Sequence, residues 1–189
     1  MRMMNKIRKK LSTGRGFSFG ELLAATIILL LASQVMAEGV TFAVRMYNES
    51  LTRSHARKLC STLTASIETE LRYATSITYD ESTGALQTYF SPNYGQSQSS
   101  FLTIDSDEQE TTSGEIAIKA TEQDQTVYRR LVSESSYSSF GLKAEIDAIQ
   151  YKENVFSVTL VILNKDNKKQ AENTFQVIPV NTLVINQNS

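Results

Sequence analysis

The stretch RGFSFGELLAATIILLLAS, residues 15–33, decides the fold of the N-terminal part of this chain. It opens a run from Leu22 to Val44 in which nearly every residue is apolar or small, with breaks at Ser33, Gln34, Glu38 and Gly39. This length is close to the ~20 residues that a helix needs to span the hydrocarbon core of a bilayer. No second run of this kind occurs in the 189 residues, so the sequence predicts one membrane-spanning helix.

Charge is distributed unevenly along the chain. Residues 1–16 hold no acidic residue and six of the 19 basic ones, namely Arg2, Lys6, Arg8, Lys9, Lys10 and Arg15. The positive-inside rule therefore places residues 1–16 in the cytoplasm and the chain beyond about residue 45 outside it. The remainder has 13 basic and 20 acidic residues, so we expect no direct binding of nucleic acid through phosphate neutralisation.

Cysteine and histidine are each represented once. Cys60 cannot form an internal disulfide, and His55 alone cannot build a histidine metal cage. We expect Cys60 to pack as a small apolar residue and His55 to be a core or interface histidine on an apolar helix face. These residues predict no cofactor.

The pentapeptide GFSFG, residues 16–20, matches the G-x-S-x-G pattern of a hydrolase nucleophile elbow. Such an elbow needs an apolar strand before the serine, and an acid and then a histidine after it. A basic tail precedes Ser18 here, and the sole histidine comes before the first aspartate, Asp80. We interpret the match as a coincidence and expect no enzymatic activity.

A cleaved secretory signal is an alternative interpretation. It would use Leu22 to Leu31 as its apolar region and be cut after Ala37, leaving a secreted or signal-anchored binding module. This interpretation does not explain Glu21, because a carboxylate at the edge of an apolar span is costly unless it is paired.

A third interpretation accounts for Glu21. Gly16-Phe17-Ser18-Phe19-Gly20-Glu21, followed by LLAATIILLLAS, resembles the processing site of type IV prepilins and pseudopilins. The shared features are a basic leader ending in glycine, then phenylalanine, a glutamate as the fifth mature residue, and an apolar helix. The resemblance covers about the first thirty residues. It implies that a prepilin peptidase cuts between Gly16 and Phe17 and methylates the new amine of Phe17.

The charges of such a cut support the resemblance independently. Cleavage at Gly16 would create an ammonium group on Phe17 at the start of an apolar helix, where an unpaired charge is costly. Glu21 lies four residues further on, about one helical turn, and can neutralise its own terminus or that of the next subunit. The resemblance implies the pairing between subunits, which would also select the packing register.

The resemblance further implies the partners and location of the protein. We expect a single-pass subunit of the inner or cytoplasmic membrane that is extracted into an extracellular or periplasmic filament, either a type IV pilus or a related type II secretion or competence filament. Its partners would be the prepilin peptidase, other pilins, membrane lipid before assembly, the polytopic platform protein and, indirectly, the assembly ATPase. The polar head favours a minor pilin or pseudopilin.

The apolar helix is expected to continue past the membrane. Beyond Val44 one apolar stripe follows a spacing of four, with Ala56 and Ala74 beside it: Leu51, His55, Leu59, Leu63, Ile67 and Leu71. Glycine is unfavourable inside a helix, so Gly39 is the expected weak point. We divide the chain into a removed leader (1–16), a membrane or filament-core helix (17–45) and an extracytoplasmic head (46–189) whose amphipathic helix ends near residue 76.

Strand patterns dominate the rest of the chain. We expect strands at residues 85–90, 101–104, 115–120 and 126–132, then an antiparallel meander of Lys143–Tyr151, Val155–Leu163 and Ala171–Ile178. Its apolar face would close over the helix stripe: Ala144, Ile146, Ala148, Phe156, Val158, Leu160, Ile162, Phe175 and Val177. The predicted fold class is α+β, a long N-terminal helix packed on a C-terminal antiparallel β-sheet, as in pilins.

One acidic segment is a candidate metal site. Asp105, Asp107, Glu108 and Glu110 offer the oxygen ligands that calcium prefers. They do not form the twelve-residue EF-hand pattern, so we expect a solvated acidic loop and no metal.

Overall fold

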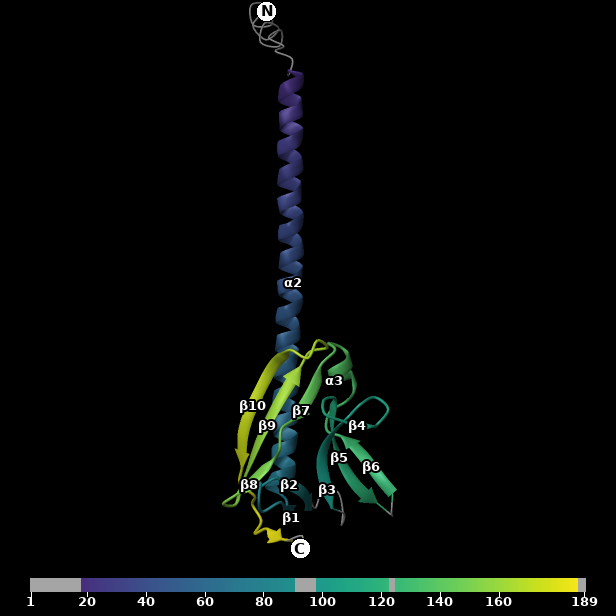
Figure 1. The fold of residues 1–189 in the computed structure, drawn as a ribbon, viewed down its shortest axis with the longest axis vertical. Helices are drawn as coiled ribbons and strands as arrows, with labels where there is room; N and C mark the ends of the chain where they lie inside the picture. The colour runs from purple at the N-terminus through teal and green to yellow at the C-terminus, as the bar shows by residue number, and fades with distance from the viewer. Residues whose placement is uncertain (1–17, 91–97, 123–124, 187–189) are drawn as a thin grey trace, which may run out of the picture. The chain divides into compact units, whose positions relative to one another are not determined.

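The computed structural model describes residues 18–90, 98–122 and 125–186. Two compact units make up the chain, Met1–Asn48 and Glu49–Ser189. The first is called the N-terminal unit and the second the head. One α-helix, α2 (Phe19–Arg72), contributes residues to both units (Figure 1).

In the N-terminal unit, α2 begins directly after Ser18, whose carbonyl accepts a hydrogen bond from the amide of Leu22 at 3.1 Å. The helix runs unbroken through Gly39, so the predicted weak point does not interrupt it. No heavy atom outside the local helix backbone lies within 4 Å of the position that a Cβ would take at Gly39.

In the head, one face of α2 is buried as the sequence predicts. Its buried residues are Ala56, Leu59, Cys60, Leu63, Ile67, Glu70 and Leu71. The upper end of the predicted stripe is less covered, because Leu51 is half-buried and His55 is exposed. The predicted core placement of His55 is therefore wrong, and its alternative placement at an interface stays a prediction.

The larger sheet pairs strands from both ends of the head's sequence. It consists of β1 (Ser76–Tyr79), β2 (Leu86–Phe90), β3 (Ser99–Ile104), β4 (Glu110–Thr111), β5 (Glu115–Glu122), β6 (Gln125–Arg130) and β11 (Val184–Ile185). Their order is β11-β1-β2-β3-β5-β6, with β4 paired to β3. Within the described residues the pairs of this sheet are antiparallel except β1 with β11, which is parallel.

The smaller sheet contains β7 (Lys143–Ile146), β8 (Gln150–Lys152), β9 (Val155–Leu163) and β10 (Lys169–Val177), in the order β10-β9-β7 with β8 also paired to β9. The short helix α3 (Ser135–Ser138) precedes it. The single strand predicted over Lys143–Tyr151 is wrong, because strand pairing is interrupted between Ile146 and Gln150, after the Asp147 amide donates to the Thr159 carbonyl at 3.0 Å. The Asp147 carboxylate accepts the amide of Ala148 at 2.9 Å, and Ala148 is exposed.

The core of the head lies where the helix stripe meets the smaller sheet. Phe156, Val158, Leu160 and Ile162 alternate along β9 with no exposed surface, and they share one buried cluster with Leu63, Ile67 and Val177. A hydrogen bond of 3.1 Å from Asn173 Nδ2 to Thr64 Oγ1 joins β10 to α2. The predicted α+β fold, a long N-terminal helix packed on antiparallel-rich sheet, is confirmed.

Candidate functional site

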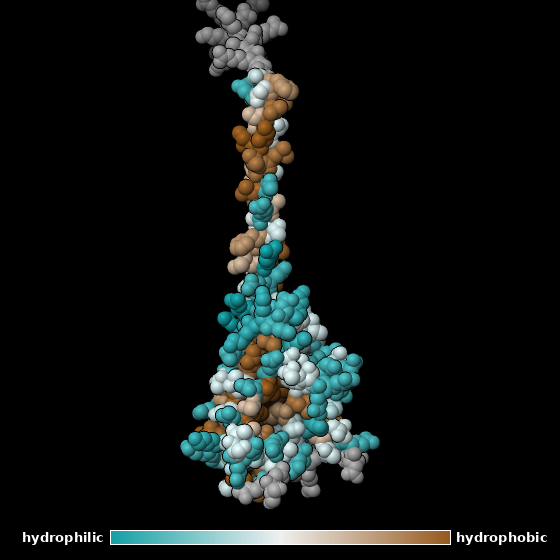
Figure 2. Space-filling view, viewed as in Figure 1, coloured by the Kyte–Doolittle hydropathy of each residue, from teal (hydrophilic) through white to brown (hydrophobic). Residues whose placement is uncertain are grey.

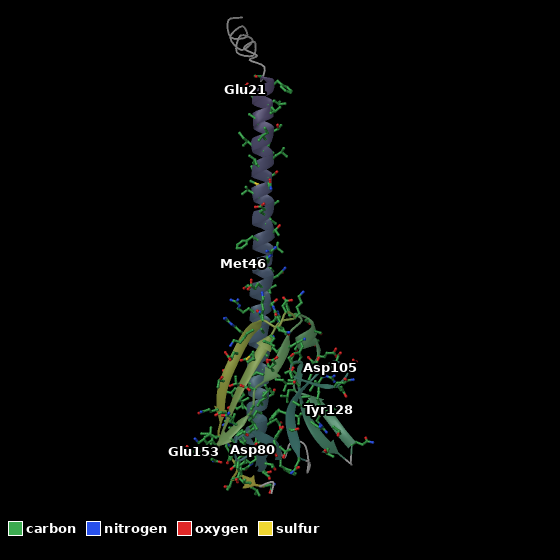
Figure 3. The ribbon with its side chains drawn as sticks, viewed as in Figure 1. Glu21, Met46, Asp80, Asp105, Tyr128 and Glu153 are labelled. Atoms are coloured by element: carbon green, nitrogen blue, oxygen red, sulfur yellow. The ribbon has the colours of Figure 1, made fainter. Side chains whose placement is uncertain are left out.

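The start of α2 is the first candidate site, and its geometry depends on Ser18 and Glu21. The backbone amide of Ser18 donates a hydrogen bond to Oε2 of Glu21 at 3.0 Å. Ser18 occupies the N-cap position and Glu21 the third helical position, so this contact is the glutamate half of a capping box. Figure 3 shows Glu21 at this end of the helix. The capping contact therefore holds the carboxylate next to the first helical turn.

The helix itself favours a negative charge at this position. The first four amide groups of a helix lack partners within it, and the helix dipole places partial positive charge there. A carboxylate in the first turn of an exposed helix gains about 0.3–1 kcal/mol from this field. Because two carboxylate oxygens accept about four hydrogen bonds, the bond from Ser18 leaves capacity for a cationic donor.

Two residues predicted for this site fall outside the described part of the chain. They are Gly16 and Phe17, the residues on either side of the expected cleavage. The structure thus positions the carboxylate of the predicted site and leaves the cleavage itself as a prediction.

A long apolar surface follows Glu21 along the helix. Every residue from Ser18 to Ser50 is exposed, including Leu29 at 70%, Val35 at 70% and Phe42 at 65%. An 18-residue window of α2 has a mean hydropathy of 1.9 and none of it is buried. Figure 2 shows brown side chains on the upper part of this segment, with hydrophilic side chains in teal among them further down. Exposed apolar surface of this extent is typical of a membrane or protein contact.

Polar side chains inside this segment bond to the helix backbone. The hydroxyls of Thr26, Ser33 and Thr41 donate to the carbonyls of Leu23, Leu30 and Ala37 at 2.8, 2.8 and 2.9 Å. Internal bonding of this kind is required in hydrocarbon, where water cannot replace it. Among the residues that the structure describes, α2 is the one helix long and apolar enough to cross a membrane, as a single span or a signal anchor.

The acidic loop has a structural role. The Asp105 carboxylate accepts the amides of Asp107 and Gln109, each at 2.9 Å, and so forms the turn between β3 and β4. Glu108 pairs with Arg130 at 2.9 Å. In the described ranges, no three histidine, cysteine, aspartate or glutamate side chains are arranged to hold a metal ion.

Glu110, the last of the four acidic residues, belongs to a second ion pair. It contacts Lys119 Nζ at 2.8 Å and accepts the hydroxyl of Tyr128 at 3.2 Å. The hydrogen bond and charge of Lys119 lower the pKa of Glu110. The loop carboxylates therefore serve a turn and ion pairs to β5 and β6, as a solvated acidic surface does.

His55 and Cys60 lie apart from the start of the helix. The His55 ring stacks on Phe140, with centroids 3.8 Å apart and an interplanar angle of 20°. Cys60 is 4% exposed, as predicted for a small apolar residue. Burial raises the pKa of its thiol, against a smaller opposite effect of the hydrogen bond with Thr64. A buried thiol of raised pKa is a poor nucleophile.

Sequence reasoning missed the structural part of Ser18. The signal was present, since a serine followed three residues later by glutamate before an apolar run is the pattern of a capping box. The G-x-S-x-G match concerns the hydroxyl of Ser18, whereas the group that contacts Glu21 is the Ser18 backbone amide.

Comparison with family models, with curated proteins and with solved structures finds no match for this chain.

Proposed function

We propose that this chain is a prepilin-like subunit, a minor pilin or pseudopilin of a type IV pilus, type II secretion or competence filament. A prepilin peptidase cuts it between Gly16 and Phe17 and methylates the new N-terminus. The observation that carries the proposal is the Glu21 carboxylate, held by the Ser18 amide at the start of an apolar helical segment that is exposed from Ser18 to Ser50.

The chemistry of the cut supports this assignment. Cleavage before Phe17 releases an α-amine one residue from the amide that already bonds to Glu21. In a medium of low dielectric constant, an ammonium and a carboxylate are each costly alone and far less so together. Pairing between neighbouring subunits would neutralise both charges and set the axial register at which the helices pack.

The apolar surface of the N-terminal unit is suited to two successive environments, the membrane and the filament. In the membrane, lipid covers side chains such as Leu29 and Val35; in the filament, helices of other subunits cover them. Burial of apolar surface contributes about 25 cal/mol per Å², which favours association once the subunit leaves the bilayer. The resemblance to prepilins implies that the platform protein and, indirectly, the assembly ATPase move the subunit from the membrane into the filament.

The structure weighs against the secreted alternative. A cut after Ala37 would leave Val40, Phe42 and Val44 on the new N-terminal segment, with exposures of 64%, 65% and 54%. The compact head begins at Glu49, beyond these residues. A secreted module would carry this apolar surface in water, whereas a filament subunit buries it.

Intact mass and N-terminal sequencing of the chain expressed with and without a prepilin peptidase test the proposal. We expect N-methylated Phe17 as the first residue when the peptidase is present and the uncut chain when it is absent. A start at Glu38 would support the secreted module, and an uncut chain in both cases would support a plain anchor. Either of these results would overturn the proposal.

A further inference from the structure

One end of the head carries an excess of positive charge. The head sequence, Glu49–Ser189, contains 12 basic and 18 acidic residues and is acidic as a whole. Seven of the basic residues nevertheless gather on the first helical turns of the head and around the β9–β10 turn. We call this set the basic collar: Arg53, Arg57, Lys58, Lys143, Lys165, Lys168 and Lys169.

Contacts within the head bring the two parts of the basic collar together. His55, beside Arg57 and Lys58 on α2, stacks on Phe140. The next residue, Gly141, lies against Lys165 of the β9–β10 turn: a Cβ on Gly141 would be 3.6 Å from Lys165 Cβ. Lys143 pairs in register with Leu163, immediately before the same turn.

The strand direction gives the same placement independently. In the head, β10 and α2 run in the same direction (Figure 1) and are joined by the bond from Asn173 to Thr64. Lys169 precedes Asn173 by four residues, about 13 Å of strand. His55 precedes Thr64 by nine residues, about 13 Å of helix. Lys169 therefore lies level with the first helical turns of the head.

The turn that presents two of these lysines is well defined. The Asn164 side chain accepts the amides of Asp166 and Lys168 at 3.0 and 2.9 Å, and Asn167 has a φ of 56°. Lys165 and Lys168 are exposed on this turn. Because the backbone is held by these bonds, the two ammonium groups are presented from an ordered surface.

Much of the positive charge in the basic collar lacks an internal counter-charge. Elsewhere in the head, Arg72, Lys119 and Arg130 pair with glutamates. In the basic collar, Arg53 pairs with Glu49 and Lys169 with Glu172. Within the part of the chain that the structure describes, no ion pair involves Arg57, Lys58, Lys165 or Lys168. Glu134 and Asp166 are the other exposed acids near this end.

The opposite end of the head carries acidic residues. Asp80 and Glu153 lie there, at the turns before β2 and β9 (Figure 3). Charge thus separates along the head, with the positive end at the residues where the chain continues into the apolar helix.

We propose that the basic collar docks the head on an anionic lipid surface while the subunit is anchored in the membrane. This inference rests on the membrane anchor of the proposed function. The basic collar begins at Arg53, four residues after Glu49, the first residue of the head, so it lies at the end of the head that is covalently joined to the membrane anchor. Anionic headgroups attract cations held within a Debye length, about 8–10 Å, of their surface.

Covalent attachment favours lipid over a free polyanion as the partner. A head tethered to the bilayer by its own helix meets lipid phosphates at a high effective concentration. Each cation near an anionic surface strengthens such an association by about fivefold. Neutralising two cations is therefore expected to lower the ratio of docked to undocked heads by about 25-fold.

A fluorescence experiment on the full chain tests this inference. A dye is attached to exposed Ser138 of α3 through Ser138→Cys, in a Cys60→Ala chain. The chain is reconstituted into vesicles of phosphatidylcholine alone or of equimolar phosphatidylcholine and phosphatidylglycerol, both with spin-labelled headgroups. We expect stronger quenching in the anionic vesicles, falling to the neutral level at high salt.

Two variants with an equal change in charge give the matched comparison. Lys165→Gln/Lys168→Gln and Lys152→Glu each lower the net charge by two, but Lys152 lies in β8, outside the basic collar. We expect the first to abolish the salt-dependent quenching and the second to retain it. Equal quenching in both kinds of vesicle, or equal loss in both variants, would overturn the inference.

Flotation of the vesicles separates this inference from the membrane anchor. If the chain floats with both kinds of vesicle but shows no salt-dependent quenching, docking of the basic collar on lipid is contradicted and the membrane anchor is not. A chain that floats with neither contradicts the anchor and the docking together. In a last test, duplex DNA is added to the chain in neutral vesicles. If the chain binds DNA as strongly as anionic lipid at the same phosphate concentration, the basic collar binds polyanions in general, and the lipid assignment is overturned.

Discussion

The hydroxyl of Tyr137 in α3 accepts a hydrogen bond from the backbone amide of Ile116 in β5 at 3.2 Å, inside the core of the head. Tyr137 is 2% exposed and Ile116 has no exposed surface. One short helix is thereby attached to the larger sheet through a main-chain group that water does not reach.

Loss of this acceptor should destabilise the head. Tyr137→Phe would leave the Ile116 amide buried and unpaired, which costs about 1–3 kcal/mol. Chemical denaturation of the full chain in detergent would measure the change in unfolding free energy. Tyr128→Phe is the comparison, because the Tyr128 hydroxyl bonds to Glu110 at an exposed site. Equal stability of both variants would contradict the role of Tyr137.

The same residue should make stability depend on alkaline pH. Burial raises the pKa of Tyr137 to about 12, and the hydrogen bond from Ile116 opposes this only in part. The unfolded state, with a tyrosine pKa near ~10, loses its proton first as the pH rises. The contribution of the protonated Tyr137 hydroxyl to the free energy of unfolding is therefore complete below about pH 10. It is lost as the pH rises towards about 12, a decrease of about 3 kcal/mol.

Denaturation curves of the wild-type chain and Tyr137→Phe between neutral and alkaline pH would measure this effect. The difference in unfolding free energy between the two chains should shrink above about pH 10, because the phenylalanine does not titrate. Parallel curves throughout would show that Tyr137 does not titrate as its burial implies.

The helix stripe should contribute strongly to the stability of the head. Leu63 has no exposed surface, and a buried leucine replaced by alanine typically costs about 2–5 kcal/mol. Leu29→Ala is the matched control, the same substitution at a site 70% exposed in the N-terminal unit. Unfolding of the head measured for both chains in detergent should shift for Leu63→Ala alone. An equal shift would mean that the buried face of α2 is not what stabilises the head.

Charge and capping at Glu21 can be separated by two substitutions. Glu21→Gln keeps an oxygen that accepts the Ser18 amide but removes the charge, whereas Glu21→Ala removes both. We expect both chains to be processed, and both to enter filaments about tenfold less or worse, because an unpaired buried charge is strongly unfavourable. The filament-bound fraction in sheared preparations measures this. Glu38→Ala should assemble normally, and normal assembly of Glu21→Gln would contradict charge pairing.

Processing should depend on Gly16. Gly16→Ala is expected to abolish cleavage, leaving a chain whose intact mass includes residues 1–16. Gly39→Ala is the matched control, because a Cβ there meets no heavy atom within 4 Å and alanine favours the helix by about 1 kcal/mol. Cleavage of Gly16→Ala at Phe17 would remove the prepilin assignment, whatever the filament assay shows.

Several elements of the fold were predictable because their signals are local. The 3.6-residue period predicted the buried face of α2 through Leu59, Leu63, Ile67 and Leu71, and alternation predicted the strand Val155–Leu163 with its buried face. Neighbouring residues set both patterns, so they can be recognised without knowing what the element packs against.

The candidate site was predictable only in part. Glu21 stands out in the sequence because a charge beside an apolar run demands an explanation. The hydrogen bond from the Ser18 amide to Glu21 follows from the spacing of a capping box, a serine followed three residues later by glutamate, which can be recognised in the sequence. The basic collar was not predictable, since Lys58 and Lys165 are more than a hundred residues apart and come to the same end of the head only after β10 folds onto α2.

By itself, the sequence determined where the long helix starts, which of its faces is apolar and where the long strands lie, because these depend on side chains within one or two turns. The tertiary structure alone decided the parallel pairing of Ser76 with Val184 and the exposure of His55. Each of these depends on residues distant in the chain, whose contacts compensate the entropy of closing the loops between them.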